Sequence, residues 1–187
     1  VVNLAGINRS QEDQDFFNVN VEFAKVVAQL VKDSDKCETL IYLSSIHAGR
    51  SDVYGQSKEQ GEQEIKRILD QSSKNLFIER FPGIFGKNAK PNYNSVISTF
   101  CHNLANGLEI KINDPEHKIK IAYIDDVIEH LKNLIFKEKY SKPLSPIYEA
   151  TVGEIAQHLS DISNDDNFIP NVGNELVKKL HSTYLFY

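Results

Sequence analysis

The 187-residue sequence contains no methionine, no tryptophan and only two cysteines. Cys37 and Cys101 lie far apart and show no CxxC or zinc-ligand spacing, so we expect free thiols and a cytoplasmic localisation. No apolar run approaches the roughly 18 residues that a membrane-spanning helix needs, so we expect no membrane partner. Dispersed basic residues and a formal net charge of −5 argue against nucleic acid as a partner. Because the chain lacks methionine and opens on an apolar run, we expect a piece of a longer protein that begins inside a strand.

The first half of the sequence alternates short apolar runs with apolar residues at helical spacing. Short apolar runs predict buried strands, and apolar residues at i, i+3, i+4 and i+7 predict amphipathic helices. The predicted elements are a strand at 1–4, a helix around 23–31, a strand at 39–43, a helix over 54–70 and a strand at 75–81. This order predicts right-handed βαβ units, and therefore an α/β fold with a doubly wound parallel sheet.

The second half is less regular. The predicted elements are a helix at 97–104, short strands at 109–112 and 118–123, a helix opened by Asp125-Asp126, a helix behind Thr151 and a last helix from about 174 to 184. Acidic residues suit a helix N-terminus because the helix dipole favours negative charge there. Thr151 and Glu154 have the spacing of a capping box. The six histidines show no ligand spacing, so we expect no metal site.

Tyr54 and Lys58 form a Tyr-x-x-x-Lys pattern on the helix predicted over 54–70. Positions i and i+4 share one helix face, so the phenol and the ammonium can address one bound molecule. Ser45 follows the apolar run at 39–43, and the carboxyl end of a parallel strand borders the ligand crevice of a doubly wound sheet. The alternatives are a solvent-facing pair and a serine that satisfies backbone groups at a strand end. Together the three side chains favour carbonyl reduction, which needs a proton donor at the oxygen and an ammonium that stabilises phenolate.

Ser45, Tyr54 and Lys58, in this order, resemble the Ser-Tyr-Lys constellation of short-chain dehydrogenases/reductases. Further segments resemble the extended, nucleotide-sugar branch of that superfamily. These are Asn3-Leu4-Ala5-Gly6, Asn20, Arg80-Phe81-Pro82-Gly83-Ile84-Phe85-Gly86 and Tyr123-Ile124-Asp125-Asp126-Val127. Two positions depart from the pattern of this branch, because Asn3 stands where it has histidine and Gly83 where it has asparagine.

A closer resemblance is to the bifunctional UDP-sugar 4-reductase/3-epimerase family of capsular polysaccharide synthesis, in the UDP-N-acetyl-L-fucosamine pathway. It rests on Lys90-Pro91-Asn92-Tyr93-Asn94-Ser95-Val96-Ile97, Thr99-Phe100-Cys101 and Ser182-Thr183-Tyr184-Leu185. The resemblance implies a Rossmann fold with a small C-terminal substrate-binding subdomain. Residues 1–90 would be the C-terminal part of the NAD(P)-binding domain, and residues 91–187 mostly the nucleotide-sugar-binding portion, interleaved with the last Rossmann elements. It also implies that a first βαβ half precedes this chain and that a cupin domain follows it.

The resemblance further implies a role for each site residue. Tyr54 would donate a proton to the C4 oxygen of the sugar, and Ser45 would hydrogen-bond that oxygen. Lys58 would hold the cofactor ribose and stabilise the phenolate, and Asn20 would anchor a water that relays protons. The implied cofactor-binding residues are Ala5, Gly6, Tyr54, Lys58, Phe81 and Pro82. The implied substrate-binding residues are Asn8, His47, Gly83, Asn94 and Ser95.

The implied function is reduction of the C4 keto group of a UDP-2-acetamido-2,6-dideoxy-hexos-4-ulose in surface polysaccharide precursor synthesis. NADP(H) is the preferred cofactor by resemblance, with NAD(H) as the alternative, and a homodimer is expected. We expect this chain by itself to be inactive. The alternatives are a nucleotide-sugar 4-epimerase, a 4,6-dehydratase or a non-catalytic NAD(P)-sensing module. A dehydratase normally needs a carboxylate pair, whereas residues 46–53 contain only Asp52; a sensing module usually loses the tyrosine or the lysine.

Overall fold

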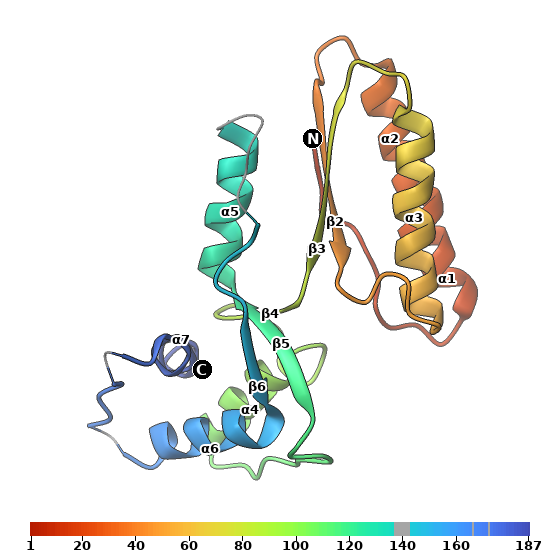
Figure 1. The fold of residues 1–187 in the computed structure, drawn as a ribbon. Coiled ribbons are helices and arrows are strands. Elements are labelled where there is room, and N and C mark those ends of the chain that lie inside the picture. The colour runs from red at the N-terminus through yellow and green to blue at the C-terminus, as the bar shows by residue number, and fades with distance from the viewer. Residues whose placement is uncertain (137–142, 166, 172) are drawn as a thin grey trace. The chain divides into compact units, whose positions relative to one another are not determined.

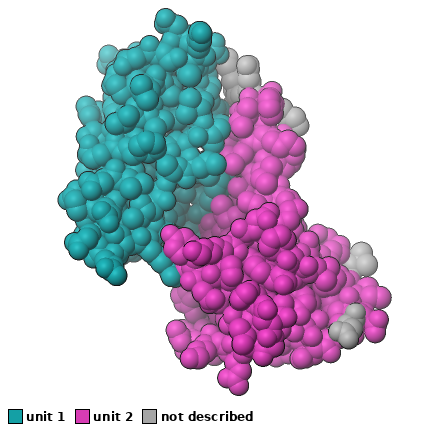
Figure 2. Space-filling view, turned by 180° about the vertical axis from the view of Figure 1, so that it is seen from behind, with its two compact units in different colours: residues 1–81 teal, residues 82–187 magenta. Residues whose placement is uncertain are grey.

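The computed structural model describes residues 1–136, 143–165, 167–171 and 173–187. The chain divides into two compact units, unit 1 from Val1 to Phe81 and unit 2 from Pro82 to Tyr187 (Figure 1, Figure 2). Each unit has a three-stranded sheet and a hydrophobic core of its own. In the described ranges, no helix combines the length and the apolarity that crossing a membrane requires.

The sheet of unit 1 is parallel and has the order β1-β2-β3. Its strands are β1 (Val2–Asn3), β2 (Thr39–Ser45) and β3 (Asn75–Phe81). β2 pairs with β3 over its whole length, and Ser45 lies opposite Phe81 at the carboxyl end of both strands. The three predicted strands are confirmed, and so is the α/β fold with a parallel sheet flanked by helices.

A helical layer packs against this sheet (Figure 1). It consists of α1 (Asp13–Phe17), the π-helical segment η1 (Asn18–Phe23), α2 (Ala24–Asp33) and α3 (Val53–Leu69). The core between sheet and helices is formed by Ala24, Ala28, Val31, Leu40, Tyr42, Ile65, Ile68 and Leu69. The predicted helices around 23–31 and over 54–70 are confirmed, whereas the apolar spacing did not predict the helical stretch from 13 to 22. The buried residues of α1 and η1 are Phe16, Asn20 and Val21, which are too few apolar residues to show a helical spacing.

The helical segments η1 and α3 approach each other closely at Gly61 of α3. A Cβ atom at this position would lie 2.3 Å from the backbone oxygen of Asn20 and 2.9 Å from the Tyr42 hydroxyl. That hydroxyl donates a hydrogen bond of 3.2 Å to the same Asn20 oxygen. A side chain at Gly61 would therefore push η1 away from α3 and break a buried hydrogen bond.

Unit 2 has a mixed sheet in the order β4-β5-β6. Its strands are β4 (Gly83–Phe85), β5 (Lys118–Tyr123) and β6 (Tyr148–Thr151), with β4 parallel and β6 antiparallel to β5. The predicted strand at 118–123 is confirmed, but the strand predicted at 109–112 is wrong. No neighbouring strand among the described residues pairs with 109–112, and an apolar run without a ladder partner does not form a strand.

The helices of unit 2 are α4 (Val96–Ala105), α5 (Ile124–Phe136), α6 (Val152–Ser163) and α7 (Glu175–Tyr184). All four agree with the predicted helices, and Asp125 and Asp126 lie in the first turn of α5 as expected. The capping box is confirmed, because Thr151 Oγ1 accepts from Glu154 N at 3.0 Å and Glu154 Oε2 accepts from Thr151 N at 2.7 Å. The core of this unit includes Phe85, Ile97, Phe100, Cys101, Ile121, Ile155, Leu159 and Leu180.

Candidate active site

Lys58 is a buried ammonium on the face of α3 that packs on the sheet. The residue is 4% exposed, and its Nζ donates a hydrogen bond of 2.8 Å to the backbone oxygen of Leu43 in β2. The same Nζ lies 4.7 Å from the centroid of the Tyr42 ring, a cation–π contact. Burial lowers the pKa of Lys58 from 10.5 to about 8, and the charge of Glu62 opposes this shift. Lys58 is therefore mostly protonated at pH 7 but close to its titration range.

Tyr54 lies one helical turn before Lys58, so that both residues share a face of α3. Its ring makes edge contacts with Phe16 at 6.4 Å and with His47 at 6.5 Å between centroids. These two contacts hold the half-buried phenol at the start of the helix. The spacing that predicted a shared face for Tyr54 and Lys58 therefore corresponds to a real helix.

Ser45 ends β2 and is 7% exposed. Its Oγ accepts a hydrogen bond of 3.1 Å from the backbone N–H of His47, which leaves the hydroxyl hydrogen of Ser45 available to another acceptor. The turn after Ser45 packs closely against Gly55 in α3, where a Cβ atom would lie 2.7 Å from the His47 backbone oxygen. The carboxyl end of β2 and the start of α3 therefore meet, which brings Ser45 and Tyr54 to the same region of unit 1.

His47, a predicted substrate-binding residue, lies in this turn. Its pKa is lowered by burial and then by the Arg50 charge, while Asp52 opposes the shift, so the imidazole is neutral at pH 7. Its Nδ1 is buried and has no hydrogen-bond partner among the described residues. Asp52 caps α3, since its Oδ1 accepts from Gly55 N at 2.7 Å.

Asn20 is fully buried on η1. Its side-chain amide bonds to both backbone groups of Ile7, accepting from N and donating to O at 3.0 Å each. The amide also donates to Ser57 Oγ at 3.0 Å. Asn20 thus fixes the loop after β1 against α3. The predicted proton-relaying water at Asn20 stays a prediction.

The loop after β1 carries the predicted cofactor residues Ala5 and Gly6 and the exposed Asn8. Ala5 N donates to Asn3 Oδ1 at 3.0 Å, whereas Asn3 Nδ2 is buried without a partner among the described residues. A Cβ atom at Gly6 would lie 3.3 Å from Asn20 Oδ1 and 3.6 Å from Lys58 Nζ. Gly6 therefore borders the Lys58 ammonium, which sequence order alone does not reveal.

The remaining predicted residues are distributed over both units. Phe81 ends β3 in unit 1, is 5% exposed, and its backbone oxygen accepts from Ile46 N at 3.0 Å. In unit 2, Pro82 is buried and Gly83 is an exposed residue of β4. Ser95 is the N-cap of α4, where its Oγ accepts from Ser98 N at 3.2 Å, and Asn94 precedes it on the surface. The structure thus brings Ser45, Tyr54, Lys58, Asn20, Ala5 and Gly6 together within unit 1.

No family model matches the chain. A curated protein of Pseudomonas aeruginosa PA103, UDP-2-acetamido-2,6-beta-L-arabino-hexul-4-ose reductase, is 33% identical over 190 aligned positions, covering 99% of this chain and 51% of that protein. The crystal structure of the capsular polysaccharide assembling protein CapF from Staphylococcus aureus is 34% identical with a TM-score of 0.86, covering 99% of this chain and 52% of that chain. The chain belongs to the extended short-chain dehydrogenase/reductase superfamily.

Solved structures of lower sequence identity share the fold. The UDP-glucose 4-epimerase of Thermotoga maritima is 18% identical with a TM-score of 0.80, covering 99% of this chain and 75% of that chain. The UDP-glucuronic acid 4-epimerase of Bacillus cereus, solved with NAD, is 17% identical with a TM-score of 0.81, covering 98% of this chain and 70% of that chain. The chain spans about half the length of the P. aeruginosa reductase and of CapF. The superfamily indicated by Ser45, Tyr54 and Lys58 is confirmed.

Sequence reasoning missed Glu62 and its ion pair with Arg80. The Arg80 guanidinium donates to Glu62 Oε1 and Oε2 at 2.8 and 2.7 Å. Ser44 Oγ donates to Glu62 Oε1 at 2.5 Å. A signal was present, since Glu62 follows Lys58 by four residues and so lies on the inward face of the predicted helix.

The described residues contain no group of three or more His, Cys, Asp or Glu side chains placed to hold a metal ion.

In unit 2, Asp126 does more than favour the α5 N-terminus. Its Oδ2 accepts from Lys179 Nζ of α7 at 2.5 Å, in a pair whose side chains are 22% and 16% exposed. This pair ties α7 to α5.

Proposed function

We propose that the protein is an oxidoreductase that reduces the C4 keto group of a UDP-2-acetamido-2,6-dideoxy-hexos-4-ulose with NAD(P)H, in capsular or surface polysaccharide precursor synthesis. The observation that carries the proposal is the buried Lys58 ammonium, which lies one turn behind Tyr54 and is bound to the strand that ends in Ser45. The reductase of P. aeruginosa, 33% identical across 99% of this chain, supports the same reaction class.

The residues around Lys58 fit a nicotinamide cofactor. A larger residue at Gly6 would fill the space in front of the Lys58 ammonium, because its Cβ would lie 3.6 Å from Nζ. Lys58 and Tyr54 would bind the ribose, with Ala5, Gly6, Phe81 and Pro82 as further contacts. When bound, the cofactor supplies the hydride. The NAD in the B. cereus epimerase structure supports this cofactor class, and the preference for NADP(H) rests on family resemblance.

The side chains of this chain manage the proton. Tyr54 donates its phenolic proton to the C4 oxygen as that oxygen gains negative charge, and the Lys58 ammonium stabilises the phenolate that is left. Ser45 donates a hydrogen bond to the same oxygen, since its own hydroxyl hydrogen is not used by the His47 N–H contact. Because burial lowers the pKa of Lys58 to about 8, the ammonium that this step requires is lost as the pH rises above that value.

The substrate is proposed to contact Asn8, His47, Gly83, Asn94 and Ser95. His47 is included because its ring contacts that of Tyr54, at 6.5 Å between centroids. Backbone N–H groups in the first turn of α4, after Ser95, suit a nucleotide diphosphate. A UDP-sugar should therefore protect the start of α4 from amide hydrogen exchange, whereas a simple ketone should not.

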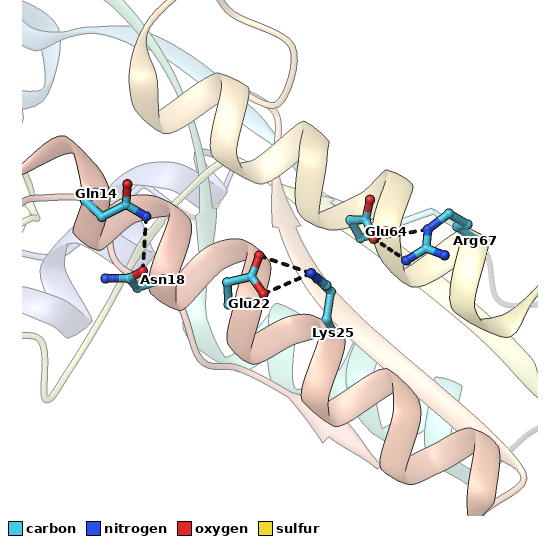
Figure 3. A network of polar contacts seen from close by, with 6 residues as sticks. All are labelled: Gln14, Asn18, Glu22, Lys25, Glu64 and Arg67. Atoms are coloured by element: carbon cyan, nitrogen blue, oxygen red, sulfur yellow. Dashed lines mark hydrogen bonds and ion pairs between the residues drawn. The ribbon is translucent and has the colours of Figure 1, made fainter.

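We also infer a cytoplasmic homodimer. The end of η1 and the following α2 expose Phe23, Val26 and Leu30 by 46%, 54% and 65%, at the i, i+3 and i+7 spacing of one helical face. The polar pair of Glu22 and Lys25 lies on the same helical segment (Figure 3). Burial against a second copy would remove this apolar surface from water. Leu30→Glu should yield monomers in sedimentation velocity, whereas a wild-type protein that sediments as a monomer would contradict the dimer.

The reaction is tested by incubating the intact protein with a UDP-linked 4-keto sugar and NADPH or NADH. The proposal expects one cofactor oxidised for each 4-hydroxy sugar that accumulates. A 4-epimerase would instead interconvert two 4-hydroxy sugars without net cofactor oxidation. A protein that binds the cofactor but turns over no 4-keto sugar would be a sensing module and would contradict the proposal.

A further inference from the structure

Glu62 is a buried carboxylate in the middle of α3 that none of the proposed steps uses. Its side chain is only 3% exposed. It accepts a hydrogen bond of 2.5 Å from Ser44 Oγ and two from Arg80, from Nε at 2.8 Å and from Nη2 at 2.7 Å. Glu62 therefore joins α3 to β2 through Ser44 and to β3 through Arg80.

These contacts lie next to the residues of the proposed reaction. Ser44 is the neighbour of Ser45 and also of Leu43, whose backbone oxygen holds the Lys58 ammonium at 2.8 Å. Glu62 follows Lys58 by one helical turn on the same buried face of α3. One carboxylate thus fixes the short stretch of β2 that positions both Ser45 and Lys58.

Glu62 is ionised at neutral pH. Burial by itself would raise its pKa, but the hydrogen bonds from Arg80 and Ser44, with the charge of Arg80, outweigh burial and hold the pKa of Glu62 below its usual value. The guanidinium that balances this charge is itself 46% exposed and therefore solvated. A buried carboxylate kept charged in this way acts on its neighbours through a medium of low dielectric.

The ionisable groups around Lys58 come from three elements. β2 contributes Tyr42, whose ring lies 4.7 Å from Nζ and whose pKa is raised by burial and then by Glu62, so it is neutral. α3 contributes Tyr54 and Glu62, and β3 contributes Arg80, which is engaged by Glu62. The π-helical segment η1 contributes the uncharged side-chain amide of Asn20. Glu62 is the carboxylate among these groups.

We propose that Glu62 is a positioning residue of the reaction: it locks the carboxyl ends of β2 and β3 to α3 and supplies the negative charge that keeps Lys58 an ammonium. The inference rests on the proposed function, because it gives Glu62 a purpose only if the Lys58 charge takes part in proton transfer. The opposing reading is a purely structural ion pair, which would affect stability and leave the titration of Lys58 unchanged.

The test compares Glu62→Gln with Glu64→Gln in the intact protein. Both variants lose one carboxylate from α3, but Glu64 pairs with the exposed Arg67 of the same helix at 2.8 Å (Figure 3). The Lys58 pKa is measured by carbon-13 NMR of labelled lysine side chains, with Lys58→Arg identifying the resonance. The pH dependence of 4-keto-sugar reduction is measured in parallel.

We expect Glu62→Gln to lower the Lys58 pKa by about one unit and to move the alkaline limb of reduction down in pH by a similar amount, with Glu64→Gln unchanged in both. A Lys58 pKa that is the same in Glu62→Gln and wild type would overturn the inference. A lowered Lys58 pKa with an unmoved pH profile would instead overturn the proposed function, because the Lys58 charge would then have no part in turnover.

A second variant covers the case in which Glu62→Gln does not fold. In Glu62→Gln/Arg80→Gln two amides replace the ion pair, so neither charge is left without its partner. The Lys58 pKa should again fall in this double variant. An unchanged Lys58 pKa in the folded double variant would equally refute the role of Glu62.

Discussion

Replacing Lys58 by methionine should change how the stability of the apo protein depends on pH. The pKa of Lys58 is about 8 in the folded protein and 10.5 in the unfolded chain, so the unfolded chain binds more protons between these values. Wild-type stability should therefore rise with pH through this window, relative to a variant that has no amine. The full difference of 2.5 pKa units corresponds to about 3 kcal/mol, because each unit is worth about 1.4 kcal/mol.

Lost packing and the lost hydrogen bond to Leu43 do not depend on pH, so they shift the Lys58→Met curve without changing its slope. We compare the difference in the free energy of unfolding, wild type minus Lys58→Met, at each pH with its value at pH 7. This difference should increase by about 1 kcal/mol at pH 9 and by about 2.5 kcal/mol at pH 10. Urea unfolding of both proteins at each pH measures this difference, and the titration of all shared groups cancels. Parallel stability curves from pH 7 to 10 would refute the account of a buried, desolvated ammonium.

Two further substitutions probe the fold. Gly61→Ala should destabilise unit 1 by several kcal/mol, roughly 3 by the usual cost of overpacking, because its Cβ would lie 2.3 Å from the Asn20 backbone oxygen; a thermal unfolding midpoint equal to wild type would count against the close contact. Thr151→Ala should cost about 1 kcal/mol in urea unfolding, since it removes the hydroxyl that accepts from Glu154 N at 3.0 Å, and no loss would show that the cap does not stabilise α6.

Local sequence patterns predicted those strands and helix starts that depend on residues close together in the chain. The strands at 75–81 and 118–123 coincide with β3 and β5, and the capping box at Thr151 marks the start of α6. The strand predicted at 109–112 failed because strand formation depends on a partner, which no local pattern encodes. The same limit explains why β4 and β6 were missed, since each has three or four residues and exists through pairing with β5.

The candidate site divides in the same way. The grouping of Ser45, Tyr54 and Lys58 could be predicted from the sequence, because Ser45 follows a predicted strand and Tyr54 and Lys58 have helical spacing. The inward position of Glu62 could also be predicted, but its partners Ser44 and Arg80 could not, because they lie 18 residues away on either side along the chain. A buried charge is recognised only when the residues that neutralise it are known.

Proton donation by Tyr54 is tested by the turnover of Tyr54→Phe, since this change removes one hydroxyl and leaves the ring contacts with Phe16 and His47 in place. In the intact protein, kcat for reduction of the 4-keto sugar nucleotide should fall by about 10²–10⁴, the usual worth of a positioned general acid, while the unfolding midpoint stays at its wild-type value. Tyr184→Phe is the matched control, because it loses a hydroxyl that donates to Ser163 Oγ at 3.2 Å in unit 2, and it should keep its kcat. A Tyr54→Phe enzyme with near-wild-type kcat would contradict proton transfer by Tyr54 and, with it, the proposed reductase mechanism.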